Sequence, residues 1–330
     1  MTNRYARPRL IEIHEQSYTP PAIRRPVQDM LTFAWTHRVW PLQHTSPAVL
    51  AGQVLEKVLR KIGGDAEGEK VAVVDFCSGA GGPIPTIERV VNAHRSAKNL
   101  PATPFILTDI HPHPAAWSTL RHSATSLDYV PHSVDATRAD RELVGVAGKA
   151  DDATRHFRTF FLAFHHFDER GAQAVIRDAM ENADGIGIFE LQEFNVGSLL
   201  VITGLFPLTW LATPFLRPSL LQLFFTYVVP IIPLILVLDG YVSAYRTRTF
   251  AHVSPALSSP TKYLATTYPP CSSAPRREQV KYLASLAESE LQAQGKTPTG
   301  GGSWVWEQGR EAHTMGMGKM YYIVGRRADV

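Results

Sequence analysis

A glycine-rich turn after a short apolar run is the part of this sequence best suited to hold a ligand. Val71–Asp75 is an apolar run that ends in an acid, and Cys77–Gly82 follows it almost directly. The run predicts a buried parallel strand, and the small residues predict a tight turn into a helix. Glycine has no Cβ atom and tolerates positive φ, so Gly79 and Gly81 let a ligand approach the backbone. Asp75, at the strand end, can accept hydrogen bonds from an amino or cationic group of that ligand.

Two further acids follow apolar runs downstream of the turn. Asp109 closes the run that begins at Pro104, and Asp135 lies near the end of the run from Tyr129 to Ala136. One acid at a strand end is unremarkable. Three such acids, in order after a glycine-rich turn, indicate a ligand site.

Two other nucleotide-binding loops fit the turn less well. A dinucleotide-binding loop requires Gly-x-Gly-x-x-Gly and an acid about 20 residues later. Here Ile84 stands where the third glycine should be, and no strand ends in an acid at that distance. A phosphate-binding loop requires Gly-Lys-Ser/Thr, which the sequence lacks. A glycine-rich turn that binds no ligand stays open as an alternative.

The turn and the acids resemble the cofactor region of class I S-adenosylmethionine-dependent methyltransferases, whose loop reads acid-x-Gly-x-Gly-x-Gly. Cys77 replaces the first glycine of that pattern. The resemblance covers residues 71–190 and 304–325. It implies a Rossmann-like α/β fold, a seven-stranded sheet with a C-terminal antiparallel hairpin, S-adenosylmethionine as cofactor and S-adenosylhomocysteine as product. The residues assigned to the cofactor are Asp75, Cys77, Ser78, Gly79, Gly81, Asp109, Ile110, Asp135, Ala136 and Phe164.

The resemblance also places the elements around these residues. It implies that Asp109 accepts hydrogen bonds from the ribose hydroxyls and that Asp135 meets the adenine amino group. Ser46 followed by Pro47 is a helix start signal, because proline suits the first helical position. Strands are expected at residues 71–75, 104–109, 129–136, 157–164, 185–190, 304–307 and 320–325, and helices at residues 29–40, 46–62 and 277–294.

The histidine pair His165–His166 directly follows the expected fourth strand, where the family places residues that face the acceptor. Histidine titrates near neutral pH, so either ring could remove a proton from an acceptor oxygen. Adjacent strand-end residues point in opposite directions, so we expect one ring at the acceptor; a packed ring beside a solvated one is the alternative. Glu190 and Glu193 are expected to make polar contacts in the same cleft. The remaining histidines are scattered, and we predict no metal site.

The expected acceptor is a small phenolic or carboxylic acid metabolite that is methylated on oxygen. A sulfonium methyl group is already activated, so positioning of the acceptor is the main requirement. Trp35 and Trp40 could line its pocket, and Tyr245, Arg246 and Arg248 could hold it as an anion. A membrane-associated methyltransferase of a lipid or hydrophobic metabolite stays open, as does a catalytically silent binding subunit with the same fold.

Residues 196–238 form an unusually apolar segment. Its second stretch, 220–238, approaches the length that spans a bilayer, but Pro230 and Pro233 interrupt it. We therefore expect a helical lid or homodimer interface, with a membrane-dipping hairpin and a transmembrane pair as alternatives. We expect four parts along the chain. They are an N-terminal helical cap (1–64), the cofactor half of the core (65–194), the insertion (195–240) and the C-terminal part of the core (241–330).

Composition narrows the class of protein. The 330 residues carry a net charge of +3, with 19% charged and 45% hydrophobic residues, which suits a globular protein. There is no basic run, so we predict no nucleic-acid partner. Two distant cysteines, Cys77 and Cys271, do not make a disulfide framework. The first residues have no apolar core, so the expected location is cytoplasmic, with peripheral membrane association left open.

Overall fold

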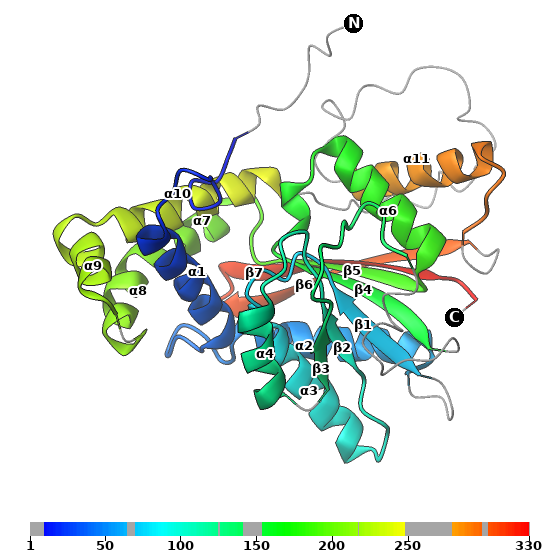
Figure 1. The fold of residues 1–330 in the computed structure, drawn as a ribbon, viewed down its shortest axis with the longest axis horizontal. Coiled ribbons are helices and arrows are strands. Elements are labelled where there is room, and N and C mark those ends of the chain that lie inside the picture. Colours follow the sequence, from blue (N-terminus) through cyan, green and yellow to red (C-terminus); the bar gives the residue numbers. More distant parts are fainter. Residues whose placement is uncertain are drawn as a thin grey trace, which may run out of the picture.

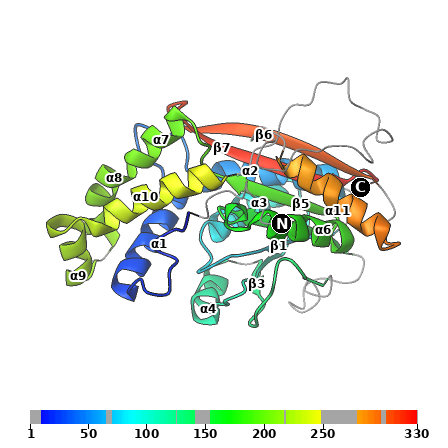
Figure 2. The ribbon, with the colours of Figure 1, turned by 90° about the horizontal axis from the view of Figure 1, so that it is seen from above.

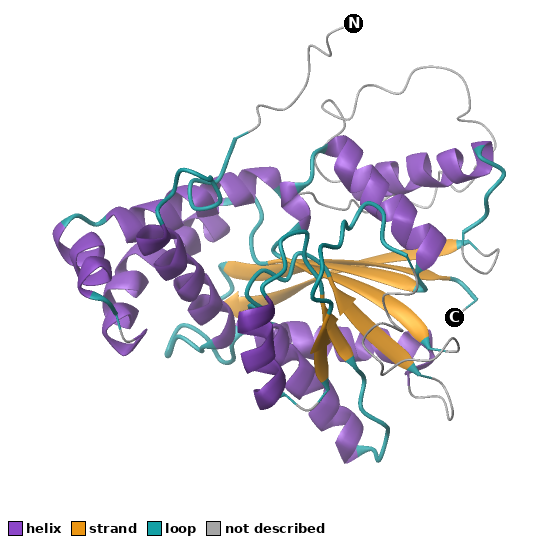
Figure 3. Cartoon of the chain, viewed as in Figure 1, coloured by secondary structure: helices purple, strands orange, loops and turns teal. Residues whose placement is uncertain are grey.

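A central β-sheet organises the structure, which is a computed structural model that describes residues 10–64, 70–124, 126–140, 154–216, 218–247, 279–298 and 303–329. Within these ranges the sheet has seven strands in the order β3-β2-β1-β4-β5-β7-β6 (Figures 1 and 3). The strands are β1 (Val71–Asp75), β2 (Phe105–Leu107), β3 (Leu127–Tyr129), β4 (Arg155–Phe161), β5 (Gly185–Glu190), β6 (Trp304–Thr314) and β7 (Gly318–Arg327).

The first five strands are parallel, and β7 lies antiparallel between β5 and β6. The predicted seven-stranded α/β fold with a C-terminal hairpin is therefore confirmed. The predicted bounds of β1 and β5 are also confirmed, whereas β4 ends at Phe161 and both hairpin strands are longer than expected. The expected third strand was wrong in position, because β3 ends where that prediction began, at Tyr129.

Helices cover both faces of the sheet and also form a separate group at one end (Figures 1 and 2). Short 3₁₀ or π turns lie at Arg60–Gly64, Phe164–His166, Thr213–Leu216 and Phe224–Val228. The α-helices are α1 (Pro21–Thr36), α2 (Pro47–Leu59), α3 (Ile84–Ala97), α4 (Pro114–Ser123), α6 (Glu169–Asn182), α7 (Val196–Thr203), α8 (Leu205–Ala212), α9 (Leu220–Leu223), α10 (Ile231–Arg246) and α11 (Gln279–Ala293).

The alternation of side chains along β1 divides the core into two layers. Ala72 and Val74 pack on the face covered by α6 and α11, whereas Val71 and Val73 pack on the face covered by α2 and α3. Successive strand residues point to opposite faces, so a strand buried on both sides needs apolar residues throughout. Burial on both faces of the sheet therefore explains the continuous apolar run from which β1 was predicted.

The first two helices show how proline sets helix bounds. Helix α2 begins at Pro47 after Ser46, as predicted. Helix α1 runs over Pro21–Thr36 and not over residues 29–40. Pro21 occupies its first turn, where the missing N–H costs nothing. The helix ends before Trp40, because the residue that precedes a proline, here Pro41, is disfavoured in helical conformation.

The apolar insertion is helical, as predicted, and lies beyond the edge of the sheet together with α1 (Figures 1 and 2). Val27 and Met30 of α1 form a core there with Ala212, Ile232 and Leu236 of the insertion. Val196–Leu216 is long and apolar enough to cross a membrane, although 22% of its apolar window is buried within the protein. The segments Leu220–Val228 and Ile231–Arg246 pass the same test together but meet at a 70° bend.

A buried ion pair between β4 and α6 allows the packing of this helix on the sheet to be tested. Arg158 of β4 is fully buried and pairs with Asp178 of α6, and its Nη2 also donates to Ala139 O at 2.6 Å. We expect Asp178→Asn to lower the free energy of unfolding by about 3–5 kcal/mol, because it leaves a buried guanidinium without its counter-charge. Urea unfolding measures this change.

The control is Glu290→Gln, which breaks the pair between Glu290 and Arg177 on the surface of the same helix layer. An exposed pair contributes about 0–1 kcal/mol. Equal losses for the two variants would contradict the assigned role of Arg158.

Candidate active site

The glycine-rich turn after β1 has the conformation that its sequence predicts. Cys77, Gly79 and Gly81 all have positive φ, at 57°, 52° and 104°. A Cβ atom on Gly79 would meet nothing within 4 Å, so the backbone conformation, and not crowding, favours glycine there. Open space beside a bare backbone leaves room for a ligand at this turn.

Asp75 holds the turn from inside. Its carboxylate is 2% exposed and accepts hydrogen bonds from Ser78 Oγ at 2.6 Å and Thr159 Oγ1 at 3.0 Å. Thr108 Oγ1 donates to the Asp75 carbonyl at 2.8 Å, so β1, β2 and β4 are joined below the turn. Burial raises the pKa of Asp75 to about 7, and the hydrogen bonds from Ser78 and Thr159 offset only part of that increase. The structure thus gives Asp75 partners within the protein.

Asp109 and Asp135 lie on the loops that follow β2 and β3. Asp109 Oδ2 accepts from Gly79 N at 2.8 Å, and its Oδ1 accepts from His111 N at 2.7 Å. Asp109 is therefore in contact with the glycine-rich turn. Asp135 is exposed and accepts from Thr137 N at 2.9 Å. The Asp109 carbonyl accepts from Val134 N at 2.9 Å, which brings the two loops together.

The other residues assigned to the cofactor lie around the same edge of the sheet. Ile110 is 51% exposed, whereas Ala136 and Phe164 are buried in the core under α6. Burial raises the pKa of the Cys77 thiol, and the carboxylates of Asp109, Asp75, Glu15 and Asp135, in falling order, raise it further. The negative charge of Asp109, Glu15 and Asp135 acts on the turn and would favour a cationic ligand.

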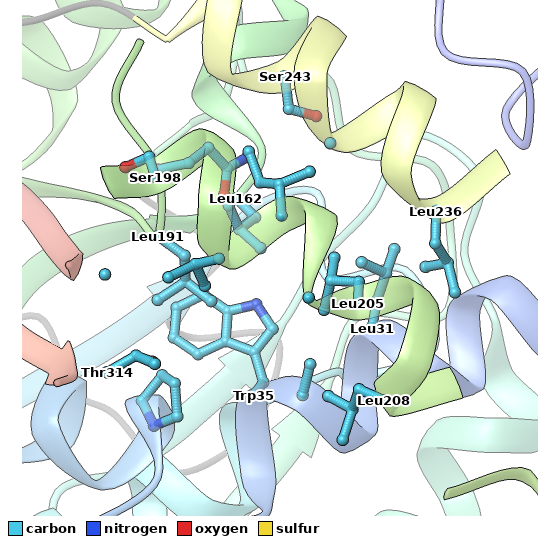
Figure 4. A pocket seen from close by; sticks show the side chains of 18 of the residues that line it. Leu31, Trp35, Leu162, Leu191, Ser198, Leu205, Leu208, Leu236, Ser243 and Thr314 are labelled. Atoms are coloured by element: carbon cyan, nitrogen blue, oxygen red, sulfur yellow. The ribbon is translucent and has the colours of Figure 1, made fainter. Parts of the chain in front are cut away.

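A cavity of about 300 Å³ lies between the sheet edge, α1 and the insertion. Its wall is largely apolar, and Figure 4 shows the Trp35 ring among Leu31, Leu191 and Leu205. This volume is at the small end of the range for ligand pockets. Polar side chains also line it, namely Glu12, His14, Gln43, His165, His166, Gln192, Ser198, Asp239, Ser243, His313 and Thr314.

The histidine pair lies at this cavity on the 3₁₀ turn Phe164–His166, which follows β4. The two rings are 4.2 Å apart between centroids, and both line the cavity. They do not point in opposite directions as expected, because a 3₁₀ turn does not alternate its side chains as a strand does.

Carboxylates lie on both sides of the His165 ring. Its Nδ1 is 2.9 Å from Glu190 Oε2, and its Nε2 is 3.2 Å from Glu12 Oε1. Burial by itself would lower the pKa of His165, but Glu190 and Glu12 together raise it to about 10. Burial would likewise raise the pKa of Glu12, but His165, followed by His166 and Ser243, lowers it to about 2.

Glu12 reaches this position because the residues that follow it are held in place. The Asp239 carboxylate of α10 accepts from Ile13 N at 2.7 Å, His14 N at 3.0 Å and His14 Nδ1 at 2.8 Å. Arg24 of α1 donates to three carbonyls of the same segment, those of His14, Gln16 and Thr19.

Sequence reasoning did not identify Glu12, His14, Glu15, Asp239 or Ser243. The only signals are an acid and histidine cluster before the first helix and an aspartate that directly follows a long apolar run.

The predicted acceptor residues separate into three groups. Trp35 lines the cavity. Glu190 and Arg246 contact the histidine pair, since Arg246 Nη2 donates to His166 O at 2.8 Å. Three others are not at the cavity wall: Trp40 is 75% exposed, Glu193 pairs with Arg310, and the Tyr245 ring packs edge-on against Phe194. Arg248 lies outside the described residues.

Comparison with known proteins finds distant structural likeness only. No family model and no curated protein sequence matches this chain. The plantazolicin methyltransferase BamL in complex with SAH shares 9% identity over 92% of this chain and 99% of its own, with a TM-score of 0.40. Magnesium protoporphyrin IX methyltransferase from Synechocystis PCC 6803, with bound SAH, shares 10% identity over 91% and 93%, with a TM-score of 0.41. An O-methyltransferase family protein from Burkholderia thailandensis shares 13% identity over 84% of this chain and 57% of its own, with a TM-score of 0.32.

Likeness at this level says nothing about what the chain binds. The strand order β3-β2-β1-β4-β5-β7-β6, with β7 antiparallel, is observed directly in this structure and does not depend on those comparisons. The chain has a class I methyltransferase-like fold.

The raised pKa of Asp75 predicts a pH-dependent stability. The Asp75 carboxyl has a pKa of about 7 in the folded protein and an ordinary pKa of 3.8 in the unfolded chain. Between these two pH values, Asp75 therefore ionises readily only in the unfolded chain. The stability that Asp75 contributes is therefore lost as the pH rises through this window. Asp75→Asn removes the effect, so the variant should gain about 2–4 kcal/mol relative to the natural chain between pH 4.5 and 8.

Urea unfolding of both proteins at the two pH values gives this difference. Asp128→Asn, on β3, is the control for titration of other carboxylates. A stability difference between the Asp75 variant and the natural chain that stays constant with pH would contradict the burial argument.

Proposed function

We propose that this protein is an S-adenosylmethionine-dependent methyltransferase. The observation that supports this best is the open glycine-rich turn held by Asp75 and Asp109. Glu15 links this turn to the apolar cavity, because its charge raises the pKa of Cys77 and its carboxylate lies 3.3 Å from His166 in the cavity wall. The fold supports the assignment, because ligands bind at the carboxyl edge of open parallel sheets. The acids around Cys77 suit the positive charge of the cofactor's sulfonium.

The proposed acceptor is a small phenolic or carboxylic acid metabolite that is methylated on oxygen. Leu31, Trp35 and Leu191 would contact its apolar body. Both nitrogens of the His165 ring face carboxylates, Nδ1 that of Glu190 and Nε2 that of Glu12, so this ring would hold the Glu12 carboxylate at the wall of the acceptor site. His166, whose Nδ1 lies 3.3 Å from Glu15 Oε2, would accept the proton of a phenol. Arg246 adds positive charge beside both rings.

Cofactor binding makes the first test of this proposal. Asp109→Ala removes the ribose acceptor and the hydrogen bond from Gly79 N, so S-adenosylmethionine affinity should fall about 5–150-fold, or 1–3 kcal/mol. Isothermal calorimetry measures the affinity. Asp168→Ala is the matched control, because Asp168 also accepts a backbone N–H, that of Gly171, but at the start of α6. Unchanged affinity in Asp109→Ala, or binding of NAD in place of S-adenosylmethionine, would refute the assignment.

Turnover separates an enzyme from a silent binding subunit. We expect release of S-adenosylhomocysteine with at least one member of a panel of phenols, carboxylic acids, amines and lipids. His166→Ala should reduce the rate about 100-fold or more for a phenol, the usual contribution of a general base. His94→Gln, on the exposed side of α3, is the control. Cofactor binding without release for any acceptor would favour the silent subunit.

The outer face of the insertion supports a second candidate function, that of a membrane-associated methyltransferase of hydrophobic metabolites. Residues 196–238 contain one charged residue, Arg217. Single exposed apolar side chains are ordinary, but a group of this size marks a partner or membrane surface. The large apolar side chains exposed there are Val196, Leu200, Trp210, Leu211, Phe215, Leu220, Leu221, Phe224, Tyr227, Val228, Val229, Leu234 and Leu238. A homodimer that uses this surface is the rival proposal.

Vesicle flotation distinguishes the two proposals. The natural chain should float with neutral phosphatidylcholine vesicles, and the double variant Phe215→Glu, Leu220→Glu should remain in solution, because these side chains are 83% and 85% exposed. Val305→Glu, on β6, is the control for an added charge at an exposed apolar position. A dimer by light scattering that the double variant dissociates, without vesicle binding, would contradict the membrane proposal.

A further inference from the structure

Three side chains in the cavity wall direct ligand atoms toward one point. His165 Nε2 lies 3.2 Å from Glu12 Oε1, and His166 Nδ1 lies 4.0 Å from the same oxygen. Glu15 Oε2 lies 3.3 Å from His166 Nδ1. These atoms come from the segment before α1 and from the turn after β4, so tertiary structure brings them together.

Their spacing suits a shared metal ion. Zinc binds imidazole nitrogen and carboxylate oxygen at about 2.0–2.2 Å, which places two donors of one tetrahedral ion about 3.3–3.6 Å apart. The 3.2 Å between His165 Nε2 and Glu12 Oε1 is close to the lower end of this range. The separation of His166 from Glu12 would need to shorten by about 0.5 Å on binding.

Each of these two imidazole nitrogens faces a carboxylate. His165 Nε2 and His166 Nδ1 are buried, and they face the carboxylates of Glu12 and Glu15 at 3.2 and 3.3 Å without the geometry of a regular hydrogen bond. The opposite nitrogen of His165, Nδ1, is bonded to Glu190 Oε2 at 2.9 Å. A carboxylate on the far nitrogen orients a metal-bound histidine and fixes its tautomer. His165 therefore presents the arrangement of a ligand with its supporting carboxylate.

The net charge around the two imidazole rings favours a divalent cation. Glu12, Glu15 and Glu190 contribute three negative charges if all are ionised, and the guanidinium of Arg246 lies 3.7 Å from Glu12 Oε1. With neutral imidazoles, one guanidinium balances one carboxylate, and two negative charges remain.

We propose that Glu12, His165 and His166 bind one divalent transition-metal ion such as Zn²⁺. Two imidazoles with carboxylates suit zinc, iron or nickel better than magnesium or calcium, which prefer oxygen alone. The sequence predicted no metal site, because the histidines outside this pair are scattered; Glu12 comes beside the pair only in the folded chain.

The consequence for the reaction rests on the proposed function. The ion would lie in the wall of the acceptor cavity, where it would act as a Lewis acid on an acceptor oxygen. It would take the place of the proton on His165, and a metal-bound phenol would not need His166 as a base.

Metal binding is measured on the full-length protein, after treatment with a chelator and removal of the chelator. Calorimetry with Zn²⁺ should give one site per chain, and Co²⁺ should give visible d–d absorption. Glu12→Gln and His166→Ala should each lower Zn²⁺ affinity at least 100-fold. Glu190→Gln should lower it about 10–100-fold, the usual effect of a supporting carboxylate. Circular dichroism checks that each variant is folded.

The matched control is His313→Asn, which removes a buried histidine of the same cavity that bonds to Thr314 Oγ1 and not to the cluster. Zn²⁺ affinity should be unchanged in His313→Asn and in Asp109→Ala. Because Asp109→Ala affects only cofactor binding, failure of cofactor binding and failure of metal binding can be told apart. Absence of a Zn²⁺ site in the natural chain would overturn the proposal. So would loss of the site in His14→Gln with retention in His166→Ala, because His14 also lies near Glu12 and Glu15.

Discussion

The Glu12 carboxylate joins the parts of the chain that form the cavity. It is 3% exposed and lies beside His165 after β4, and it accepts from Ser243 Oγ of α10 at 2.8 Å. A buried carboxylate is costly unless charges and hydrogen bonds compensate for its desolvation. The segment before α1, the turn after β4 and the last helix of the insertion therefore meet at this carboxylate. The bonds of Asp239 to Ile13 and His14, and of Arg246 to His166, join the same parts.

The two ends of the candidate site obey different constraints. At the turn after β1, hydrogen bonds from Ser78 and Thr159 to Asp75 fix the backbone before any ligand binds. In the cavity, apolar side chains of α1 and of the insertion provide shape, and polar groups are concentrated near Glu12. Function lies in the site and not in the fold, so helices outside the sheet can differ between proteins that share the sheet.

Local patterns in the sequence predicted the elements that depend on local chemistry. The buried strands β1 and β5 and the start of α2 at Pro47 follow from apolar runs and proline signals. The three-residue strand β3 was misplaced, because the stronger apolar pattern lies after Tyr129. The contacts of Glu12 and His14 with α10 join residues more than 220 positions apart. No periodicity in a single sequence encodes such pairs.

We propose that the turn after β1 holds S-adenosylmethionine with its methyl group directed toward the histidine pair. A crystal structure of the protein with S-adenosylhomocysteine tests this directly. We predict the ribose at Asp109, the adenine beside Ile110 and Asp135, and the sulfur facing His165 and His166 across the cavity. A cofactor bound elsewhere, or at the turn with its sulfur directed away from the cavity, would contradict the account.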